Sequence, residues 1–312
     1  MTRHLFVLNP AAGTKDRTEN LTEAIKRLKL KEPYDIFITD GVRAAENGVC
    51  RYLSEHKDDF VRVYACGGDG TLSEVVNGAF RSGGKNYAVA VVPIGSGNDF
   101  VKSLGIPAEC FLDLQALIKG DAVDVDLLLA KDADNVERVS LNIISAGFDA
   151  AVCKGQERVK KLPLVSGKSA YNISLVKSVF TKTKHYFVLK VDGQRFGDSA
   201  GPYLFAIAAN GKYYGGGFKA SPYSDISDGV MEFIRIDTVS PVKLLSLVGK
   251  FREGRHIDEL KDIVATKQCK TMQFVSDKPI DINLDGEIVP MKNPTIRILH
   301  HATKIILPKN ED

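Results

Sequence analysis

Hydrophobic and polar positions alternate along the first third of the chain in a pattern typical of strands followed by helices. Apolar runs with the length of buried strands lie at residues 5–8, 34–39, 61–66 and 88–92. Between the first three of these runs, residues 17–30 and 42–56 carry apolar side chains at helical spacing. Strands that alternate with helices in this way predict a parallel sheet covered by helices.

From about Val123 the pattern changes, because strand-like segments now follow one another with few helices between them. These segments lie at residues 123–129, 136–144, 186–191, 203–208, 230–236, 271–275, 280–283 and 295–299. Helices are expected at about 171–182 and 241–252. The dipeptides Asp192-Gly193 and Asp285-Gly286 are typical of hairpin turns. This part of the chain therefore predicts a mainly antiparallel β-sandwich.

The change of pattern predicts an α/β protein of two domains. Residues 1–122 form an α/β domain with a parallel sheet, and residues 123–302 form the β-sandwich domain. The apolar stretch near the C-terminus predicts that residues 303–312 pack back on the first domain. A chain of 312 residues is long enough to build two such cores.

Composition and charge argue against several other classes of protein. Hydrophobic residues make up 44% of the chain and charged residues 26%, as in ordinary globular proteins. No apolar run reaches the roughly 18 residues that a membrane-spanning helix needs, and residues 1–10 do not read as a signal peptide. The five dispersed cysteines predict reduced thiols in the cytoplasm and no zinc site. A net charge of only +3 predicts no nucleic-acid partner.

The segment Gly67-Gly68-Asp69-Gly70-Thr71 follows the third predicted strand, and a helical pattern begins at Thr71. Glycines let the backbone turn and expose its N–H groups, and the start of a helix adds further N–H groups, so the loop resembles a phosphate cradle. A carboxylate beside phosphate is repulsive unless a cation lies between them. Asp69 therefore predicts Mg²⁺ together with a nucleotide polyphosphate. An ordinary strand-to-helix turn is the alternative.

A second glycine-rich turn, Gly95-Ser96-Gly97-Asn98-Asp99, follows the fourth predicted strand. Ser96 can donate to phosphate, Asn98 can cap the next helix, and Asp99 adds a second carboxylate. Polar residues also follow the first two strands, at Asn9-Pro10 and Thr39-Asp40-Gly41. Ligands of parallel sheets bind at the carboxyl ends of the strands, so four such loops at one edge predict one site.

Two further Asp-Gly pairs could supply chemistry or could be turns only. Asp285-Gly286-Glu287 places two carboxylates at a hairpin tip, where one could accept a proton from an alcohol. Asp228, before Gly229, could hold a structural cation with nearby backbone carbonyls. Walker A and protein-kinase motifs are absent from the sequence.

The chain is similar to diacylglycerol kinase catalytic domains, a group that includes sphingosine kinases and soluble bacterial lipid kinases. Four motifs occur in the order seen in that family: Asn9-Pro10-Ala11-Ala12-Gly13, Gly67-Gly68-Asp69-Gly70-Thr71, Pro93-Ile94-Gly95-Ser96-Gly97-Asn98-Asp99 and Asp285-Gly286-Glu287. The resemblance implies that ATP binds in a cleft between the domains and that a lipid hydroxyl accepts its γ-phosphoryl group. The implied reaction is the conversion of diacylglycerol to phosphatidic acid.

The resemblance also implies roles for individual residues. The nucleotide would be lined by Asn9, Pro10, Ala11, Ala12, Gly13, Thr39, Gly67, Gly68, Asp69, Gly70, Thr71, Glu74, Gly95, Ser96 and Asn98. Asp69 and Asp99 would organise Mg²⁺ and water, and the base would be Asp285 or Glu287. A structural Mg²⁺ would be held by Asp228 with the backbone carbonyls of Asp225 and Val230.

The identity of the lipid stays open at this point. The sequence Gly95-Ser96-Gly97-Asn98 resembles the sphingosine and ceramide kinase form of the motif, and no cysteine-rich lipid-binding module is present. An NAD kinase-related enzyme that phosphorylates a soluble ribose is a second reading, although the Asn-Glu motif usual in such enzymes is not found. A nucleotide-binding regulator without turnover is a third. Preference for ATP over GTP and a homodimeric state are also open.

The segment from Lys154 to His185 carries eight lysine or arginine side chains and one glutamate, a local net charge of 8 − 1 = +7. The apolar residues 162–165 interrupt these basic positions. Basic residues beside apolar ones fit an anionic membrane surface, so we expect a peripheral membrane protein whose lipid substrate lies at that surface. A solvated helical face is the alternative.

Overall fold

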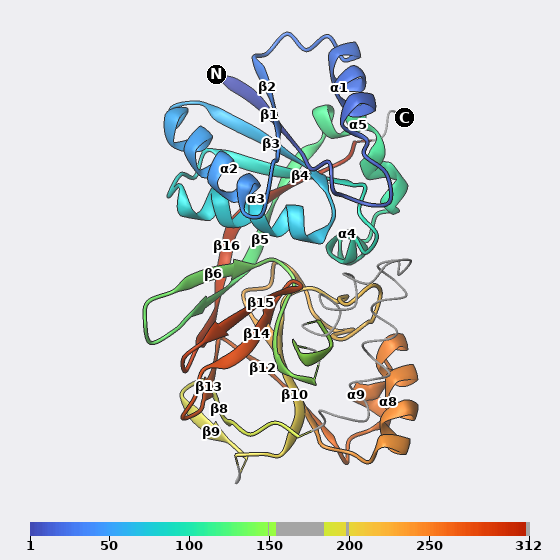
Figure 1. Cartoon of the computed structure of the whole chain (residues 1–312), viewed down its shortest axis with the longest axis vertical. Coiled ribbons are helices and arrows are strands. Elements are labelled where there is room, and N and C mark those ends of the chain that lie inside the picture. The colour runs from blue at the N-terminus through green and yellow to red at the C-terminus, as the bar shows by residue number, and fades with distance from the viewer. Residues whose placement is uncertain (149, 154–183, 198–199, 310–312) are drawn as a thin grey trace. The chain divides into compact units, whose positions relative to one another are not determined.

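A computed structural model describes residues 1–148, 150–153, 184–197 and 200–309 of the chain. The fold consists of two compact units (Figure 1). Unit 1 contains Met1–Asp126 and His301–Asp312, and unit 2 contains Leu127–His300. The chain passes from one unit to the other twice, once within β5 (Asp121–Lys131) and once within β16 (Thr295–Leu307).

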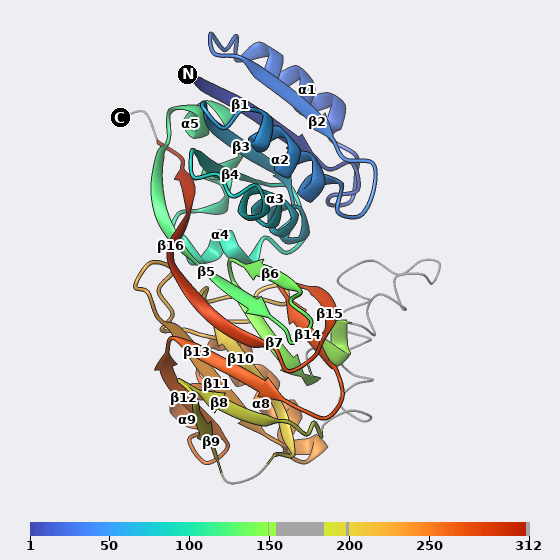
Figure 2. The ribbon, with the colours of Figure 1, turned by 90° about the vertical axis from the view of Figure 1, so that its left-hand side faces the viewer.

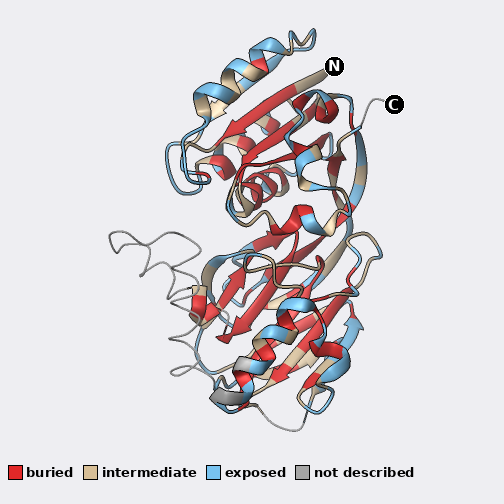
Figure 3. Cartoon of the chain, turned by 90° about the vertical axis from the view of Figure 1, so that its right-hand side faces the viewer, coloured by how far each residue is buried: buried red, intermediate tan, exposed pale blue. Residues whose placement is uncertain are grey.

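Unit 1 is built on a parallel sheet of four strands in the order β2-β1-β3-β4. Their bounds are Thr2–Leu8 for β1, Tyr34–Ile38 for β2, Phe60–Gly67 for β3 and Tyr87–Pro93 for β4. The C-terminal part of β16 adds a fifth parallel strand, in which Ile305 pairs with Val89 of β4. Strand β4 is buried along its whole length, as expected for the interior of a sheet covered on both faces (Figure 3).

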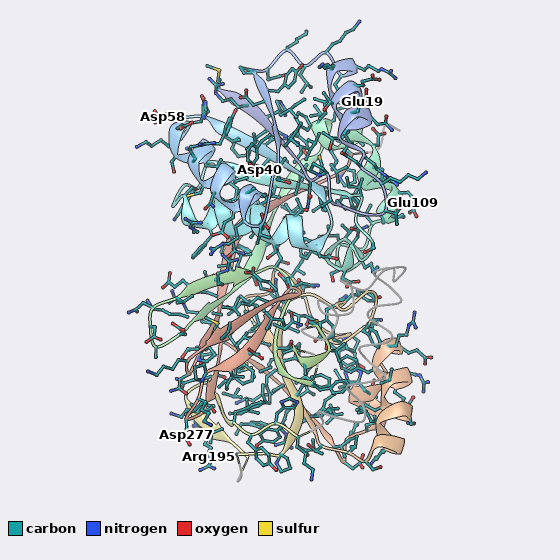
Figure 4. All side chains as sticks on the ribbon, viewed as in Figure 1. Glu19, Asp40, Asp58, Glu109, Arg195 and Asp277 are labelled. Atoms are coloured by element: carbon teal, nitrogen blue, oxygen red, sulfur yellow. The ribbon has the colours of Figure 1, made fainter. Side chains whose placement is uncertain are left out.

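Helices cover both faces of this sheet. The bounds are Thr18–Arg27 for α1, Ala44–Glu55 for α2, Asp69–Arg81 for α3, Asp99–Ser103 for α4, Leu114–Lys119 for α5 and Ala108–Leu112 for the 3₁₀ turn η1. Helices α2 and α3 lie on one side of the strands and α1 and α5 on the other (Figures 1 and 2). Charged side chains such as Glu19, Asp58 and Glu109 are exposed at the periphery of the unit (Figure 4).

Unit 2 is a β-sandwich. Its six-stranded antiparallel sheet has the order β12-β11-β10-β7-β14-β15. These strands are β7 (Ile143–Gly147), β10 (Tyr203–Ala209), β11 (Met231–Asp237), β12 (Val264–Cys269), β14 (Ile280–Leu284) and β15 (Glu287–Met291). The second layer contains the N-terminal part of β16 with β13 (Thr271–Val275), β8 (Val188–Val191) and β9 (Gln194–Phe196).

Two hydrophobic cores hold this unit together. The first lies between the two layers, where Ile144 and Phe233 of the six-stranded sheet share one cluster with Leu189 and Phe274 of the other layer. The second lies on the outer face of the six-stranded sheet. That face is covered by helix α8 (Pro241–Glu253), which contributes Phe251 and is followed by the short helix α9 (His256–Glu259).

The structure confirms the predicted fold class, an α/β unit with a parallel sheet joined to a mainly antiparallel sandwich. The single strand expected at 136–144 is wrong, because it breaks into β6 (Glu137–Ser140) and β7. The break occurs where the backbone N–H groups of Leu141 and Ile143 donate to the Asp285 carboxylate instead of to a neighbouring strand. Strand β15 was missed because it contains Pro290, which is tolerated only because β15 is an edge strand.

The helix expected at 171–182 lies outside the described residues. In the part of the chain that the structure covers, no helix is long and apolar enough to cross a membrane.

Candidate active site

Three of the predicted loops meet at the carboxyl edge of the unit 1 sheet. The backbones of the glycine-rich loops after β3 and β4 touch, since a Cβ on Gly68 would lie 3.2 Å from the Cα of Gly95. The loop after β1 joins them through Asn9, whose side-chain amide donates to Thr71 Oγ1 over 2.9 Å. Gly13, with φ +76°, lies against the carbonyl oxygen of Ile94. Glycine is needed at these contacts because any Cβ would push the loops apart.

Asp69 links the two glycine-rich loops through its carboxylate. Helix α3 begins at Asp69, two residues before the predicted start at Thr71. Asp69 Oδ1 accepts hydrogen bonds from the N–H groups of Asp99 at 2.7 Å and Phe100 at 3.3 Å, the first donors of α4. Burial, together with the nearby negative charge of Asp99, raises the pKa of Asp69 above its usual value. A carboxylate in this state gains strongly from a bound cation.

Asn98 does not cap α4 with its side chain, contrary to the sequence-based expectation. Its side-chain amide donates to the carbonyl oxygens of Pro93 at 3.1 Å and Gly95 at 2.9 Å, and its backbone is left-handed with φ +51°. Asn98 therefore holds the shape of its own loop. The cap is supplied by Asp69, which lies 30 residues earlier in the chain and so gives no local sign of this role.

Asp99 is buried, and its carboxylate is paired with Lys102 one turn further along α4. Lys102 Nζ lies 2.6 Å from Asp99 Oδ1 and also donates to the carbonyl oxygen of Gly97 at 3.0 Å. A Cβ on Gly97 would lie 2.7 Å from Asp69 Oδ2 and 3.8 Å from Asp99 Oδ2. Gly97 therefore packs closely against the Asp69 carboxylate, with the Asp99 carboxylate nearby. Carboxylate oxygens are the ligands that Mg²⁺ prefers.

Other predicted nucleotide-lining residues differ in what they contact. Ser96 is exposed, and Thr39 donates its backbone N–H to Leu8 at the end of β1. The carboxylate of Glu74 accepts hydrogen bonds from the N–H groups of Arg43 at 2.9 Å and Ala45 at 3.1 Å. It therefore caps the beginning of α2. Of the remaining predicted residues, Pro10, Ala11 and Ala12 lie in the loop after β1, Gly67 ends β3, and Gly70 lies in the first turn of α3.

In unit 2, the Asp285-Gly286 turn joins β14 to β15 and is tied to the link between β6 and β7. Asp285 Oδ1 accepts the N–H of Ile143 at 2.8 Å, and Oδ2 accepts the N–H of Leu141 at 3.0 Å. Gly286 N–H donates to Asn283 Oδ1 at 2.8 Å. Both oxygens of Asp285 are therefore engaged by backbone donors, which hold this carboxylate in place.

Glu287 is differently placed, since 43% of its side chain is exposed. Its Oε2 lies 2.7 Å from a terminal nitrogen of Arg138, whose own side chain is only 6% exposed. The structure thus brings a buried guanidinium of β6 to a half-exposed carboxylate at the hairpin tip. Asp285 and Glu287 have distinct surroundings although they are two residues apart.

The predicted structural metal site has carboxylates that close local turns. Asp228 Oδ1 accepts the N–H of Val230 at 3.0 Å, and Asp225 Oδ1 accepts the N–H and hydroxyl of Ser227 at 2.9 Å. These turns lie in exposed or half-exposed parts of the chain. The metal at this turn stays a prediction.

Lys102 and Arg138 are two residues that sequence reasoning missed. The spacing of Asp99 and Lys102 on one helix was a usable signal, because residues three apart are neighbours on a helix. Arg138 gave no signal in the sequence, since its partner is 149 residues away.

The basic segment Lys154–Lys184 lies outside the described residues except for Lys184.

Comparison with known proteins adds to this geometry. Residues 3–130 match the model of the diacylglycerol kinase catalytic domain. Residues 142–307, more than half of the chain, match the model of the YegS C-terminal NAD kinase beta sandwich-like domain. The chain belongs to this family of diacylglycerol kinase catalytic domains with a YegS-type C-terminal domain. It is accordingly a lipid kinase, and kinase membership implies ATP as the co-substrate.

Members of the family resemble the chain over its whole length. A protein of Yersinia enterocolitica named "Probable lipid kinase YegS-like" is 26% identical over 99% of this chain and 98% of its own. A diacylglycerol kinase of Bacillus subtilis is 24% identical over 100% of this chain and 98% of its own. The crystal structure of a diacylglycerol kinase from Bacillus anthracis superposes with a TM-score of 0.71 at 22% identity, covering 97% of this chain and 96% of that one. That structure supports the fold.

Proposed function

We propose that this chain transfers the γ-phosphoryl group of ATP to the hydroxyl of diacylglycerol and so forms phosphatidic acid. The acceptor is suggested by full-length similarity to the Bacillus subtilis diacylglycerol kinase. The observation that carries the proposal is the contact between the loops of Gly68 and Gly95, with the carboxylates of Asp69 and Asp99 beside them. The glycine-rich loop at the start of α3 offers backbone N–H groups that suit the phosphates of a nucleotide, whereas the first donors of α4 are taken by Asp69.

In this proposal unit 1 binds the phosphates. The loops that start at Asn9, Gly67 and Gly95 cradle them. Asp69 and Asp99, whose carboxylates both lie near Gly97, would hold Mg²⁺. When bound, the ion neutralises charge on the phosphate oxygens. Lys102 orients the Asp99 carboxylate through the 2.6 Å contact. We assign a second, structural Mg²⁺ to Asp228 and to the carbonyls of Asp225 and Val230.

We assign the base to Glu287. An acceptor hydroxyl must lose its proton as its oxygen bonds to the γ-phosphorus and the bond to ADP breaks, so a carboxylate with an accessible oxygen is required. Glu287 is half-exposed, and only its Oε2 is engaged among the described residues. Asp285 accepts backbone hydrogen bonds with both of its oxygens and serves to fix the hairpin.

A lipid-panel assay with labelled ATP tests the proposal. The panel contains diacylglycerol, sphingosine and ceramide in mixed vesicles, with NAD as a water-soluble acceptor. We expect label in an organic-phase product that co-migrates with phosphatidic acid, and none with the Asp69→Ala variant. Label in phosphorylated sphingosine or ceramide would change the acceptor only, and label in an aqueous product from NAD would overturn the lipid assignment.

A further inference from the structure

The contact between Arg138 and Glu287 joins two side chains of very different burial. Arg138 is almost completely enclosed on β6, and Glu287 is 43% exposed at the hairpin tip. An arginine side chain keeps its charge in a protein, and a buried charge needs an anion close to it. Its terminal nitrogen meets that need through Glu287 Oε2 at 2.7 Å.

The hairpin does not require this ion pair to keep its turn. The backbone at Asp285 and Gly286 has φ +50° and φ +100°, as expected for an Asp-Gly hairpin turn. The turn is already held by Asn283 and by the backbone donors of the β6–β7 link. The backbone of the turn is therefore fixed by other contacts, and the guanidinium of Arg138 acts on the Glu287 side chain.

We infer that Arg138 is a positioning residue, which orients the carboxylate of Glu287 for proton acceptance. This inference rests on the proposed function of Glu287. A glutamate has several rotatable bonds, and a partly exposed one samples many rotamers. Binding of Oε2 to a buried guanidinium selects one direction and leaves Oε1 for the acceptor. Such pre-orientation matters because small misplacements of a reacting group cost up to about 100-fold in rate.

A second ion pair of β6, made with β5 instead of β15, is an ordinary surface contact. Lys131 of β5 lies 2.9 Å from Glu137 of β6, with the two side chains 47% and 40% exposed. Glu137 is the neighbour of Arg138 in the sequence. Removing Lys131 thus provides a matched control that disturbs an ion pair of β6 without touching Glu287.

The experiment compares kcat and KM of Arg138→Met, Arg138→Lys and Lys131→Met with the full-length wild-type protein, using diacylglycerol vesicles. We expect Arg138→Met to lower kcat by about 10- to 100-fold while the KM for ATP stays within about threefold. Arg138→Lys should recover most of the rate, because an ammonium can reach the same oxygen. Lys131→Met should behave as wild type.

A double-mutant cycle with Glu287→Gln separates the inference from the proposed function. If Arg138 acts through Glu287, then Arg138→Met should lower kcat by less than about threefold in the Glu287→Gln background. A normal kcat for Arg138→Met, or the same loss with and without Glu287, would overturn the positioning role. A normal kcat for Glu287→Gln would instead overturn the base assignment, and the inference would fall with it. If Arg138→Met does not fold, Arg138→Gln takes its place in the same cycle.

Discussion

Gly78 of α3 packs directly against the backbone of Glu46 in α2, so closely that a Cβ at position 78 would overlap the Glu46 carbonyl group. Glu46 is completely buried at this contact, and its carboxylate pairs with Arg43 and with Arg81 of α3. The close approach of the two helices thus brings together a glycine, a buried carboxylate and the cations that neutralise it.

Gly78→Ala should destabilise the protein by about 1–3 kcal/mol, because the added methyl group must push α2 and α3 apart. Glycine-to-alanine changes inside helices otherwise stabilise by about 0.5–1 kcal/mol. Gly249 of α8 provides the control, since a Cβ there would meet nothing within 4 Å. Urea unfolding should therefore give opposite signs for Gly78→Ala and Gly249→Ala. Equal signs would contradict the packing described here.

Asp69→Asn should lower turnover by several orders of magnitude. Asparagine keeps an oxygen for the N–H groups of Asp99 and Phe100, so the cap of α4 should survive. The charge for Mg²⁺ is lost, so magnesium-dependent ATP binding should weaken strongly. Calorimetry with and without EDTA measures this. ATP binding that neither EDTA nor the substitution changes would remove Asp69 from the metal site.

Asp285→Asn and Glu287→Gln should both lower stability but should differ in their effects on turnover. The amide nitrogen that Asp285→Asn introduces would face the N–H of either Leu141 or Ile143, so we expect a loss of about 1–3 kcal/mol in unfolding free energy. Glu287→Gln keeps an oxygen for Arg138 but removes the negative charge beside this buried guanidinium, so we expect it to lower stability as well. It should also lower kcat by about 100-fold or more, the scale for loss of a general base. Thermal unfolding and steady-state kinetics on both variants distinguish an anchor from a base.

His256 should make the protein less stable as the pH falls. Burial lowers its pKa from 6.5 to about 4, and its Nε2 lies 3.1 Å from the carbonyl oxygen of Ala220. Well above pH 6.5 His256 is unprotonated in both the folded and the unfolded chain, so its titration does not change the stability. Between pH 6.5 and about 4 the unfolded chain takes up a proton and the native chain does not, so stability falls. The total loss is about 3 kcal/mol.

Urea unfolding of wild type and His256→Gln at about pH 7 and about pH 4.5 isolates this contribution. The wild type should lose more stability between the two values than the variant does. His4 is also buried with a lowered pKa, but it is present in both proteins and cancels in the difference. Identical losses in the two proteins would show that His256 is not the titrating group.

Changing Lys160 and Lys161 to Glu should weaken binding to anionic vesicles. Each lysine near such a surface contributes on the order of 1 kcal/mol, and the contribution fades with salt. Lys26→Glu with Lys29→Glu makes the same charge change near the end of α1 and is the control. Sedimentation with neutral and anionic vesicles measures the effect. Equal binding to both kinds of vesicle would favour the solvated-face alternative.

Local patterns in the sequence were sufficient for most of the fold and for the loops that meet in unit 1. Strands such as β3 are evident from a continuous apolar run, and the glycines at 67, 68 and 95 mark the turns that follow. What could not be predicted depends on contacts between distant residues. The cap that Asp69 gives α4, the anchor of Asp285 on Leu141 and Ile143, and the Arg138–Glu287 pair have no local signal.

The pairing of Ile305 and Ile306 with β4 has a consequence for the order in which the chain folds during synthesis. All of unit 2 leaves the ribosome before the strand that completes the unit 1 sheet. β4 pairs with β3 on one edge, and its other edge therefore stays open while the sandwich forms. An open strand edge is a site for wrong pairing. Chaperone binding to nascent chains that end before residue 301 should report this interval, in which the glycine-rich loops are already translated but their sheet still lacks the β16 strand.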